Sequence, residues 1–216
     1  MSNLNPKNFK KFLVVEGNDD VHVIANIWKE YVGDQPSVFY IDDSKGFSNV
    51  YGKLEAYCLR KKPNVEAIGV VIDADADLDA RWESIKYNLE KLGYDVPEAP
   101  AFGGTIIGSQ ERNPTIGIWL MPDNNAAGML EDFVKYLVPE NDILLIEADR
   151  ILEEIEEGQL HKYNSIHKAK ARIHTWLAWQ EDPGTPMGLA ITKSYLNTNT
   201  VLCQQFVSWL NQLFNS

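Results

Sequence analysis

Cysteine is scarce in this chain, and long apolar runs are missing. Only Cys58 and Cys203 occur among 216 residues, and neither lies in a Cys-x-x-Cys or Cys/His pattern. This argues against a disulfide framework and against a zinc site. No run of about 18 apolar residues occurs, and the first residues lack the apolar segment of a signal peptide. We therefore expect a reduced, cytoplasmic protein that does not span a membrane.

Positive charge is also in short supply. Twenty Lys and Arg residues stand against 31 Asp and Glu residues, and the formal net charge is -11. Because bulk attraction to nucleic acid needs clustered cations, a polyanion would have to be bound locally. A solvated helix face explains each basic cluster at least as well as a binding role does. The candidate clusters are Lys10–Lys11, Arg60–Lys62 and the set Lys162, Lys168, Lys170 and Arg172.

The first two thirds of the chain alternate apolar runs with segments of helical periodicity, a pattern typical of βαβ units around a parallel sheet. We expect an α/β fold with a mostly parallel central sheet flanked by helices. The expected strands cover residues 12–16, 37–41 and 67–72, and residues 105–108 and 116–121 form either a hairpin or two separate strands. The expected helices cover residues 18–32, 49–60, 80–92 and 126–137, with Asp79 capping the third.

Beyond residue 140 the pattern becomes mostly helical. Helices are expected over residues 143–157, 165–180 and 200–214, and the last carries one apolar stripe that faces either the core or a second copy of the chain. We therefore expect an α/β domain over residues 1–140 and a mostly helical extension over residues 141–216, packed on the same domain. The stripe leaves a homo-oligomer open.

Two short acidic segments follow apolar runs. Glu16 follows residues 12–15, and Asp73, Asp75 and Asp77 begin where residues 70–72 end. Ligands of open α/β sheets bind just beyond the carboxyl ends of the strands. Alternation along a strand would point Asp73 and Asp75 the same way, roughly 6.6 Å apart. Because anions at the ends of buried strands are costly without a compensating cation, we expect one or two hard divalent ions, Mg²⁺ or Mn²⁺.

Two other phosphate or metal motifs fail. Residues 46–54 resemble a P-loop with the wrong spacing, and Leu54 stands where Ser or Thr would hold magnesium. An EF-hand starting at Asp73 fails because Leu78 replaces the required glycine and Ser84 replaces the glutamate.

The order Glu16-Gly17-x-x-Asp20, two crossover units, and a strand ending in Asp73-x-Asp75 resembles the Toprim domain of topoisomerases, primases and OLD-type nucleases. The resemblance covers roughly residues 10–140. It implies a Toprim-like, Rossmann-like fold in which Glu16, Asp73 and Asp75 bind magnesium and Glu16 also acts in proton transfer. Asp77 matches the frequent third aspartate of the family.

Downstream, residues 122–133 resemble the acidic helix with which OLD-like proteins hold a second metal. Here Met129, Leu130, Phe133 and Leu137 would face the core, and Glu131 and Asp132 would lie on or near the other side. Ligand binding and a plain solvated face are equally open for these two carboxylates. Lys193 is the candidate for the lysine that often assists in the nuclease branch.

The whole chain is similar to small stand-alone Toprim-related proteins of unassigned function. It has no tyrosine-bearing DNA-gate domain, no zinc ribbon and no ATPase module, which leaves open a protein partner that supplies ATPase activity or targeting. The expected catalytic residues are Glu16, Asp73, Asp75 and Lys193. The expected metal ligands are Glu16, Asp20, Asp73, Asp75, Asp77, Glu131 and Asp132.

Our leading hypothesis is a Mg²⁺- or Mn²⁺-dependent phosphodiester hydrolase, a Toprim-type nuclease acting on DNA or RNA. A second hypothesis is a non-catalytic module that binds a metal with nucleic acid or a phosphate-bearing ligand and works with a partner. A third is a phosphatase of the haloacid dehalogenase type, which also places a DxD after a strand. Because clustered carboxylates repel one another, at least one should have a raised pKa, and added magnesium should stabilise the protein.

Overall fold

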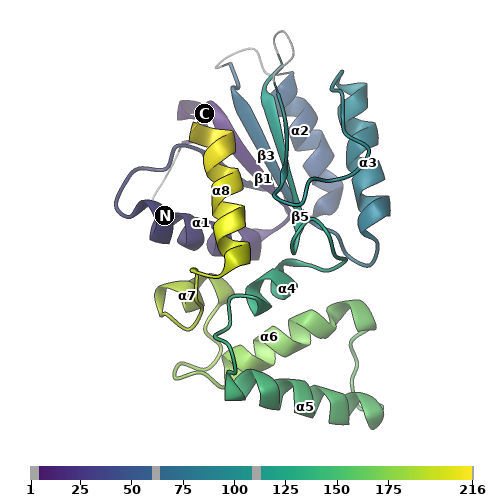
Figure 1. The fold of residues 1–216 in the computed structure, drawn as a ribbon, viewed down its shortest axis with the longest axis vertical. Helices are drawn as coiled ribbons and strands as arrows, with labels where there is room; N and C mark the ends of the chain where they lie inside the picture. Colours follow the sequence, from purple (N-terminus) through teal and green to yellow (C-terminus); the bar gives the residue numbers. More distant parts are fainter. Residues whose placement is uncertain (1–4, 60–63, 109–112, 216) are drawn as a thin grey trace.

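A five-stranded sheet forms the centre of the protein (Figure 1). The computed structural model describes residues 5–59, 64–108 and 113–215. The strands lie in the order β2-β1-β3-β5-β4, and all neighbours are parallel except β4, which runs antiparallel to β5. The mostly parallel α/β sheet predicted from sequence is therefore confirmed. The strands are β1 (Lys11–Val15), β2 (Tyr40–Asp43), β3 (Ala67–Asp73), β4 (Thr105–Ile107) and β5 (Thr115–Met121).

Helices cover both faces of the sheet (Figure 1). Successive strand residues alternate between two apolar clusters, so Val15 lies in one and Val14 in the other. The first cluster contains residues of α1, α4, α6, α7 and α8, and the second contains residues of α2 and α3. The described α-helices are α1 (Asn18–Val32), α2 (Val50–Cys58), α3 (Leu78–Lys91), α4 (Leu130–Lys135), α5 (Ile143–Glu157), α6 (Lys168–Ala178), α7 (Met187–Thr192) and α8 (Val201–Asn215).

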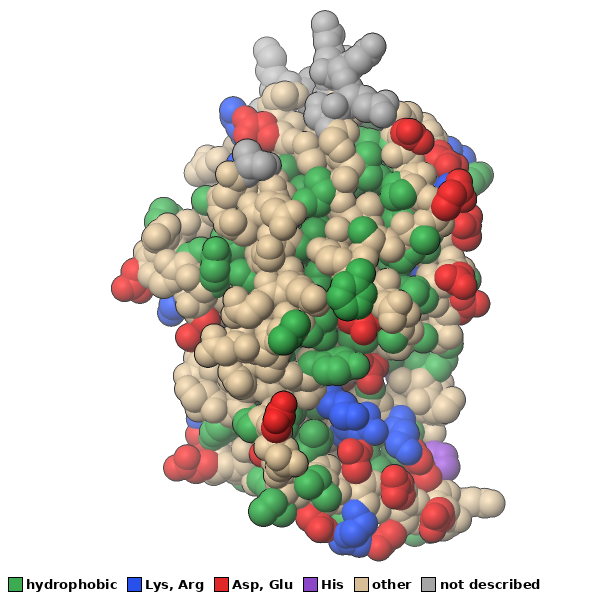
Figure 2. Space-filling view, viewed as in Figure 1, with side chains coloured by type: hydrophobic (Ala, Val, Ile, Leu, Met, Phe, Trp, Pro, Cys, Tyr) green, Lys and Arg blue, Asp and Glu red, His purple; other side chains and the backbone are tan. Residues whose placement is uncertain are grey.

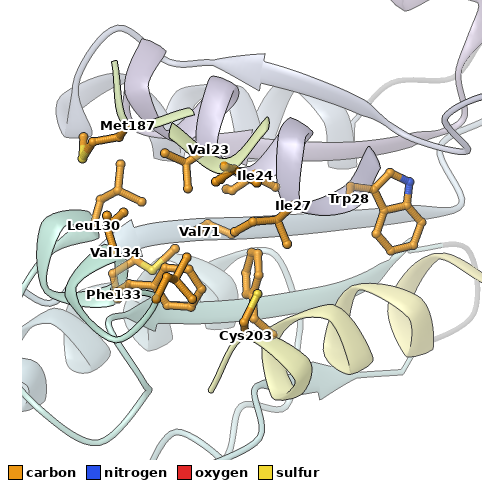
Figure 3. Close-up of a cluster of buried hydrophobic side chains, with 14 of the residues drawn as sticks. Val23, Ile24, Ile27, Trp28, Val71, Leu130, Phe133, Val134, Met187 and Cys203 are labelled. Atoms are coloured by element: carbon orange, nitrogen blue, oxygen red, sulfur yellow. The ribbon is translucent and has the colours of Figure 1, made fainter. Parts of the chain in front are cut away.

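The C-terminal helix α8 lies directly on the sheet. Gly69 in β3 and Gly117 in β5 are register partners, and the Leu213 side chain lies over both. A Cβ atom at Gly117 would collide with Leu213 and touch Trp209. The missing side chains at these two positions therefore let α8 approach the strands. Figure 3 shows the same core nearer the carboxyl end of β3, where side chains of α1, α4 and α8 surround Val71.

The strand order creates a switch point between β1 and β3. The chain goes from β1 to β2 on one side and then crosses to β3 on the other side of β1. In such sheets the crevice beyond the carboxyl ends of the two strands at the reversal is where ligands bind. The residues that follow β1 and β3 therefore occupy this position.

Several expected boundaries were wrong. Strand β2 starts at Tyr40 rather than at residue 37, and α3 is capped by Asp77, whose Oδ1 accepts a hydrogen bond from Ala80 N (2.9 Å), rather than by Asp79. Helix α4 starts at Leu130 rather than at residue 126, because Asp123 accepts main-chain hydrogen bonds that form a turn there. Helix α7 was not predicted.

Other expectations were met or fall outside the described part of the chain. Helix α5 covers the expected residues 143–157, and β4 pairs with β5 as a hairpin partner. The connection at residues 109–112 and the basic residues Arg60–Lys62 lie outside the described residues. Among the described residues, no helix is both long enough and apolar enough to span a membrane.

Candidate functional site

Two carboxylates meet at the switch point. Glu16 directly follows β1, Asp73 is the last residue of β3, and the strands are in register with Val15 opposite Val71. The Asp73 main-chain N–H donates a hydrogen bond to Glu16 Oε1 at 2.9 Å. Two segments 57 residues apart in sequence are thus in direct contact.

The acidic residues are held in place by main-chain N–H groups. Gly17 N donates to Asp20 Oδ2 (3.1 Å), Asp73 N donates to Glu16 Oε1 (2.9 Å), and Leu130 N donates to Asp73 Oδ1 (2.9 Å). Each carboxylate thereby has one oxygen fixed. The other oxygens, Glu16 Oε2, Asp73 Oδ2 and Asp20 Oδ1, accept no hydrogen bond from any described residue.

Asp20 is the most constrained member of the set. It lies in the first turn of α1 and is only 7% exposed. Its Oδ1 is buried without a hydrogen-bond partner among the described residues. A buried, unpartnered carboxylate oxygen is costly unless a proton or a cation neutralises it.

A fourth carboxylate, Glu131, comes from the start of α4. It is 2% exposed, and its Oε1 lies 3.7 Å from Lys170 Nζ of α6. Of the two roles left open for Glu131, the plain solvated face is wrong, because α6 packs against α4 and buries this side chain. The expected core positions Met129, Leu130, Phe133 and Leu137 are all buried.

Burial and mutual repulsion raise the pKa values of these acids. Burial and then the nearby Glu16 raise the pKa of Asp20 to about 7. Burial, Asp20, Glu16 and Glu131 raise the pKa of Asp73 well above its usual range. Burial also raises the pKa of Glu16 and of Glu131, with Lys170 opposing the rise at Glu131. Four acids whose ionisation is disfavoured thus lie in one cluster, and positive charge placed near them would favour their ionised forms.

The four carboxylates line a cavity of about 570 Å³, which we call the acidic cavity. The rest of its wall comes from the start of α1, the turn after β2 and α6. Lys45 and Lys170 are the cationic side chains on this wall. The acidic cavity therefore combines several carboxylates with two cationic side chains.

Asp75 lies next to this cluster but points elsewhere. Strand β3 ends at Asp73, and Asp75 has a left-handed φ of 54° that is held by two main-chain hydrogen bonds with Gly128. The assumption that Asp73 and Asp75 project from one continuous strand is therefore wrong. The Asp75 carboxylate pairs with Arg81, whose guanidinium lies 3.7 Å from the centre of the Phe47 ring. Burial is the main cause of the raised pKa of Glu16, and the negative charge of Asp75 adds to it, so Asp75 lies near Glu16.

Three other predicted site residues have structural partners. Asp77 caps α3, and Asp132 Oδ2 accepts a hydrogen bond from Met129 N (3.1 Å) at the start of α4. Lys193 follows α7 and forms an ion pair with Asp182. None of the three lines the acidic cavity. Among the described residues, no three Asp, Glu, His or Cys side chains have the spacing of a preformed metal cage.

Sequence reasoning missed the cations around the site. Arg81 was not singled out, although its position in the first turn of a helix that follows an acidic loop was a usable signal. Lys170 was noticed only as one member of a basic cluster. Its contact with Glu131 depends on how α4 and α6 pack, which no local pattern reveals.

The protein is thus an α/β protein with an acidic cavity at the switch point of its sheet. A family model described as "Protein of unknown function (DUF3226)" matches residues 10–215. Because this match spans most of the chain, the protein belongs to that family. No curated protein and no solved structure gave a significant match.

Proposed function

We propose that the protein is a Mg²⁺- or Mn²⁺-dependent phosphodiester hydrolase of the Toprim type that acts on DNA or RNA. The observation that carries the proposal is the convergence of Glu16, Asp20 and Asp73, each with one oxygen fixed by a main-chain N–H and one uncommitted. Hard cations such as Mg²⁺ take carboxylate oxygens as ligands. The resemblance of the strand-end motifs to Toprim nucleases supplies the reaction class.

A bound cation would supply the partner that the buried Asp20 Oδ1 lacks among the described residues. Mg²⁺ binds oxygen at about 2.0–2.1 Å, whereas a hydrogen-bonded water needs about 2.7 Å or more. A cation bound at Asp20 Oδ1 could therefore lie closer to this oxygen than a water molecule, and Asp73 would be its second ligand. Neutralising the cluster also removes the repulsion that raises the pKa values of Asp20 and Asp73.

Each residue then has a distinct role. Asp20 and Asp73 would hold the ion, and the ion would supply charge stabilisation at the phosphate and lower the pKa of a bound water. Glu16 would orient or deprotonate the attacking water, since burial raises its pKa toward the range of a useful general base. Lys170 keeps Glu131 oriented and places a cation at the edge of the cavity.

The test is a matched pair of substitutions near the end of β3. Asp73→Asn keeps an oxygen that can accept from Leu130 N, and Asp77→Asn keeps the helix cap. With Mg²⁺ or Mn²⁺, we expect the wild type to cleave single-stranded or plasmid substrates. Asp73→Asn should lose at least about a hundredfold of this activity, in line with the loss of a main electrostatic contribution, and Asp77→Asn should retain it.

The proposal fails if the wild type cleaves neither substrate with either metal, or if Asp73→Asn is as active as Asp77→Asn. Rapid hydrolysis of a generic aryl phosphate without cleavage of any diester would instead favour the phosphatase hypothesis.

The placement of the remaining acids favours a second candidate function. Asp75 is paired with Arg81, and Asp77 and Asp132 form helix caps, so three of the carboxylates predicted as metal ligands have other partners and do not line the acidic cavity. This supports a one-ion module that binds nucleic acid or a phosphate-bearing ligand while a partner protein supplies ATPase activity or targeting. Calorimetric binding of an oligonucleotide with several metals, without turnover by any of them, would support this reading over hydrolysis.

A further inference from the structure

A second cavity, of about 350 Å³, adjoins the acidic cavity. Met129 and Ala169 line the second cavity, whereas their chain neighbours Leu130 and Lys170 line the acidic one. The start of α4 and the first turns of α6 therefore form a shared wall, on which neighbouring residues of the chain face different cavities. Two acids also lie on the wall of the second cavity: Asp75, whose carboxylate is paired with Arg81, and Asp132, which accepts a hydrogen bond from Met129 N.

Helix α6 supplies cations to both spaces. Lys168 and Arg172 line the second cavity, and Lys170 lines the acidic cavity. Residues four apart share a helix face, whereas a residue two positions away points to the opposite side. One helix thus presents basic side chains in two directions, in a protein whose formal net charge is -11. Figure 2 shows Lys and Arg side chains gathered over the α6 region of this face.

Helix α5 fixes the two cations of the second cavity. Lys168 Nζ donates to Glu156 Oε2 at 2.5 Å, and Arg172 Nε donates to Asp149 Oδ1. No described residue accepts a hydrogen bond from the two terminal NH₂ groups of Arg172. A guanidinium held at Nε with its terminal donors unused can bind a phosphate oxygen without first losing side-chain freedom.

We propose that the second cavity binds a neighbouring phosphate of a polynucleotide whose scissile phosphate lies in the acidic cavity. The inference rests on the proposed function and narrows its class of substrate. The substrate is a chain with at least two phosphodiester groups, rather than a mononucleotide or a simple phosphate ester. Arg172 is the main contact of this subsite, and Lys168 supports it.

The experiment compares a polymer with a single diester. Binding of a fluorescein-labelled, single-stranded 12-nucleotide DNA is measured by anisotropy with Ca²⁺, and gels verify that the DNA stays intact. Hydrolysis of bis(p-nitrophenyl) phosphate with Mn²⁺ reports the acidic cavity alone. Arg172→Gln should weaken DNA binding about tenfold and reduce the slope of log affinity against log salt by about 0.7. The fold-loss in DNA affinity caused by Arg172→Gln should be at least five times the fold-loss in the rate of bis(p-nitrophenyl) phosphate hydrolysis.

Two controls separate charge from helix packing. Arg150→Gln removes an arginine of α5 that pairs with Glu147 and Glu154 and lines neither cavity, so it should leave DNA affinity unchanged. Asp149→Asn removes the negative charge beside Arg172 but keeps the cation and an oxygen that can still accept from Arg172 Nε, so it should not weaken binding.

The subsite is refuted if Arg150→Gln weakens binding as much as Arg172→Gln, if Asp149→Asn reproduces the loss, or if the wild type does not bind the DNA. Absence of any hydrolysis, with the binding pattern intact, would refute the proposed hydrolase activity and leave the subsite standing.

Discussion

Replacing Asp20 with asparagine should stabilise the metal-free protein at neutral pH. The pKa of Asp20 is raised from 3.8 to about 7 in the folded protein. The native state therefore binds the Asp20 proton more tightly than the unfolded chain does, and stability falls as pH rises from about 4 to 7. At about 1.4 kcal/mol for each pH unit, this difference corresponds to at most about 4 kcal/mol above pH 7.

Asparagine removes this penalty because it has no charge to bury. Its side-chain oxygen can still accept the hydrogen bond from Gly17 N. In EDTA, the gain in unfolding free energy of Asp20→Asn over the wild type should be near zero at pH 4 and grow to several kcal/mol at pH 8. For a chain of this length that corresponds to a rise in Tm of about 10 °C. Urea unfolding at several pH values measures the difference directly.

Magnesium should stabilise the wild type more than Asp20→Asn. At pH 8 the ion binds only the folded wild-type site with full affinity, so it should raise the Tm of the wild type more than that of Asp20→Asn. Asp132→Asn is the matched control, because Asp132 has the same capping role at the start of α4 but lies outside the acidic cavity. A stability difference for Asp20→Asn that does not vary with pH, or a magnesium response equal to that of Asp132→Asn, would refute the reasoning.

Two further predictions follow from close packing and from the cation beside the site. Gly117→Ala should destabilise the protein by about 1–3 kcal/mol in urea unfolding, because its methyl group would collide with Leu213. Gly52→Ala, in α2 with open space around it, should be neutral or stabilising by up to about 1 kcal/mol, and equal effects of the two would contradict this packing. Arg81→Gln should shift the acidic limb of any pH–rate profile to higher pH, because Arg81 lowers the pKa of Glu16. An unchanged or lower limb would exclude Glu16 as the base.

The contact between Glu16 and Asp73 was predictable from the sequence because it depends on strand order alone. Unbroken apolar runs identify buried parallel strands, and such strands place their carboxyl ends at one edge of the sheet. The edge at which each acid lies therefore follows from the sequence, and the pairing of β1 with β3 then brings the two acids together. Helix α1 was equally predictable from the sequence, because its periodic pattern stops at Gly33, which is also where the helix ends in the structure.

The direction of Asp75 was not predictable in the same way. Its left-handed conformation depends on hydrogen bonds with Gly128, more than fifty residues later in the chain. The choice between Asp77 and Asp79 as the cap of α3 fails for a related reason: both suit a first turn, and the path of the loop after β3 decides between them. Local propensity predicts that such a helix or turn exists, but it does not predict which side chain caps the helix or where the side chains of the turn point.

The helical extension is part of the site rather than an addition to it. Lys170 on α6 is the cation beside the buried Glu131, and Leu213 on α8 covers the glycines of β3 and β5. Residues 1–140 alone would leave Glu131 without Lys170 and would expose the apolar sheet face that α8 covers. A domain boundary near residue 140 therefore describes a change in sequence pattern, whereas the apolar core and the acidic cavity both continue across it. The chemistry proposed for the strand ends accordingly requires the whole chain.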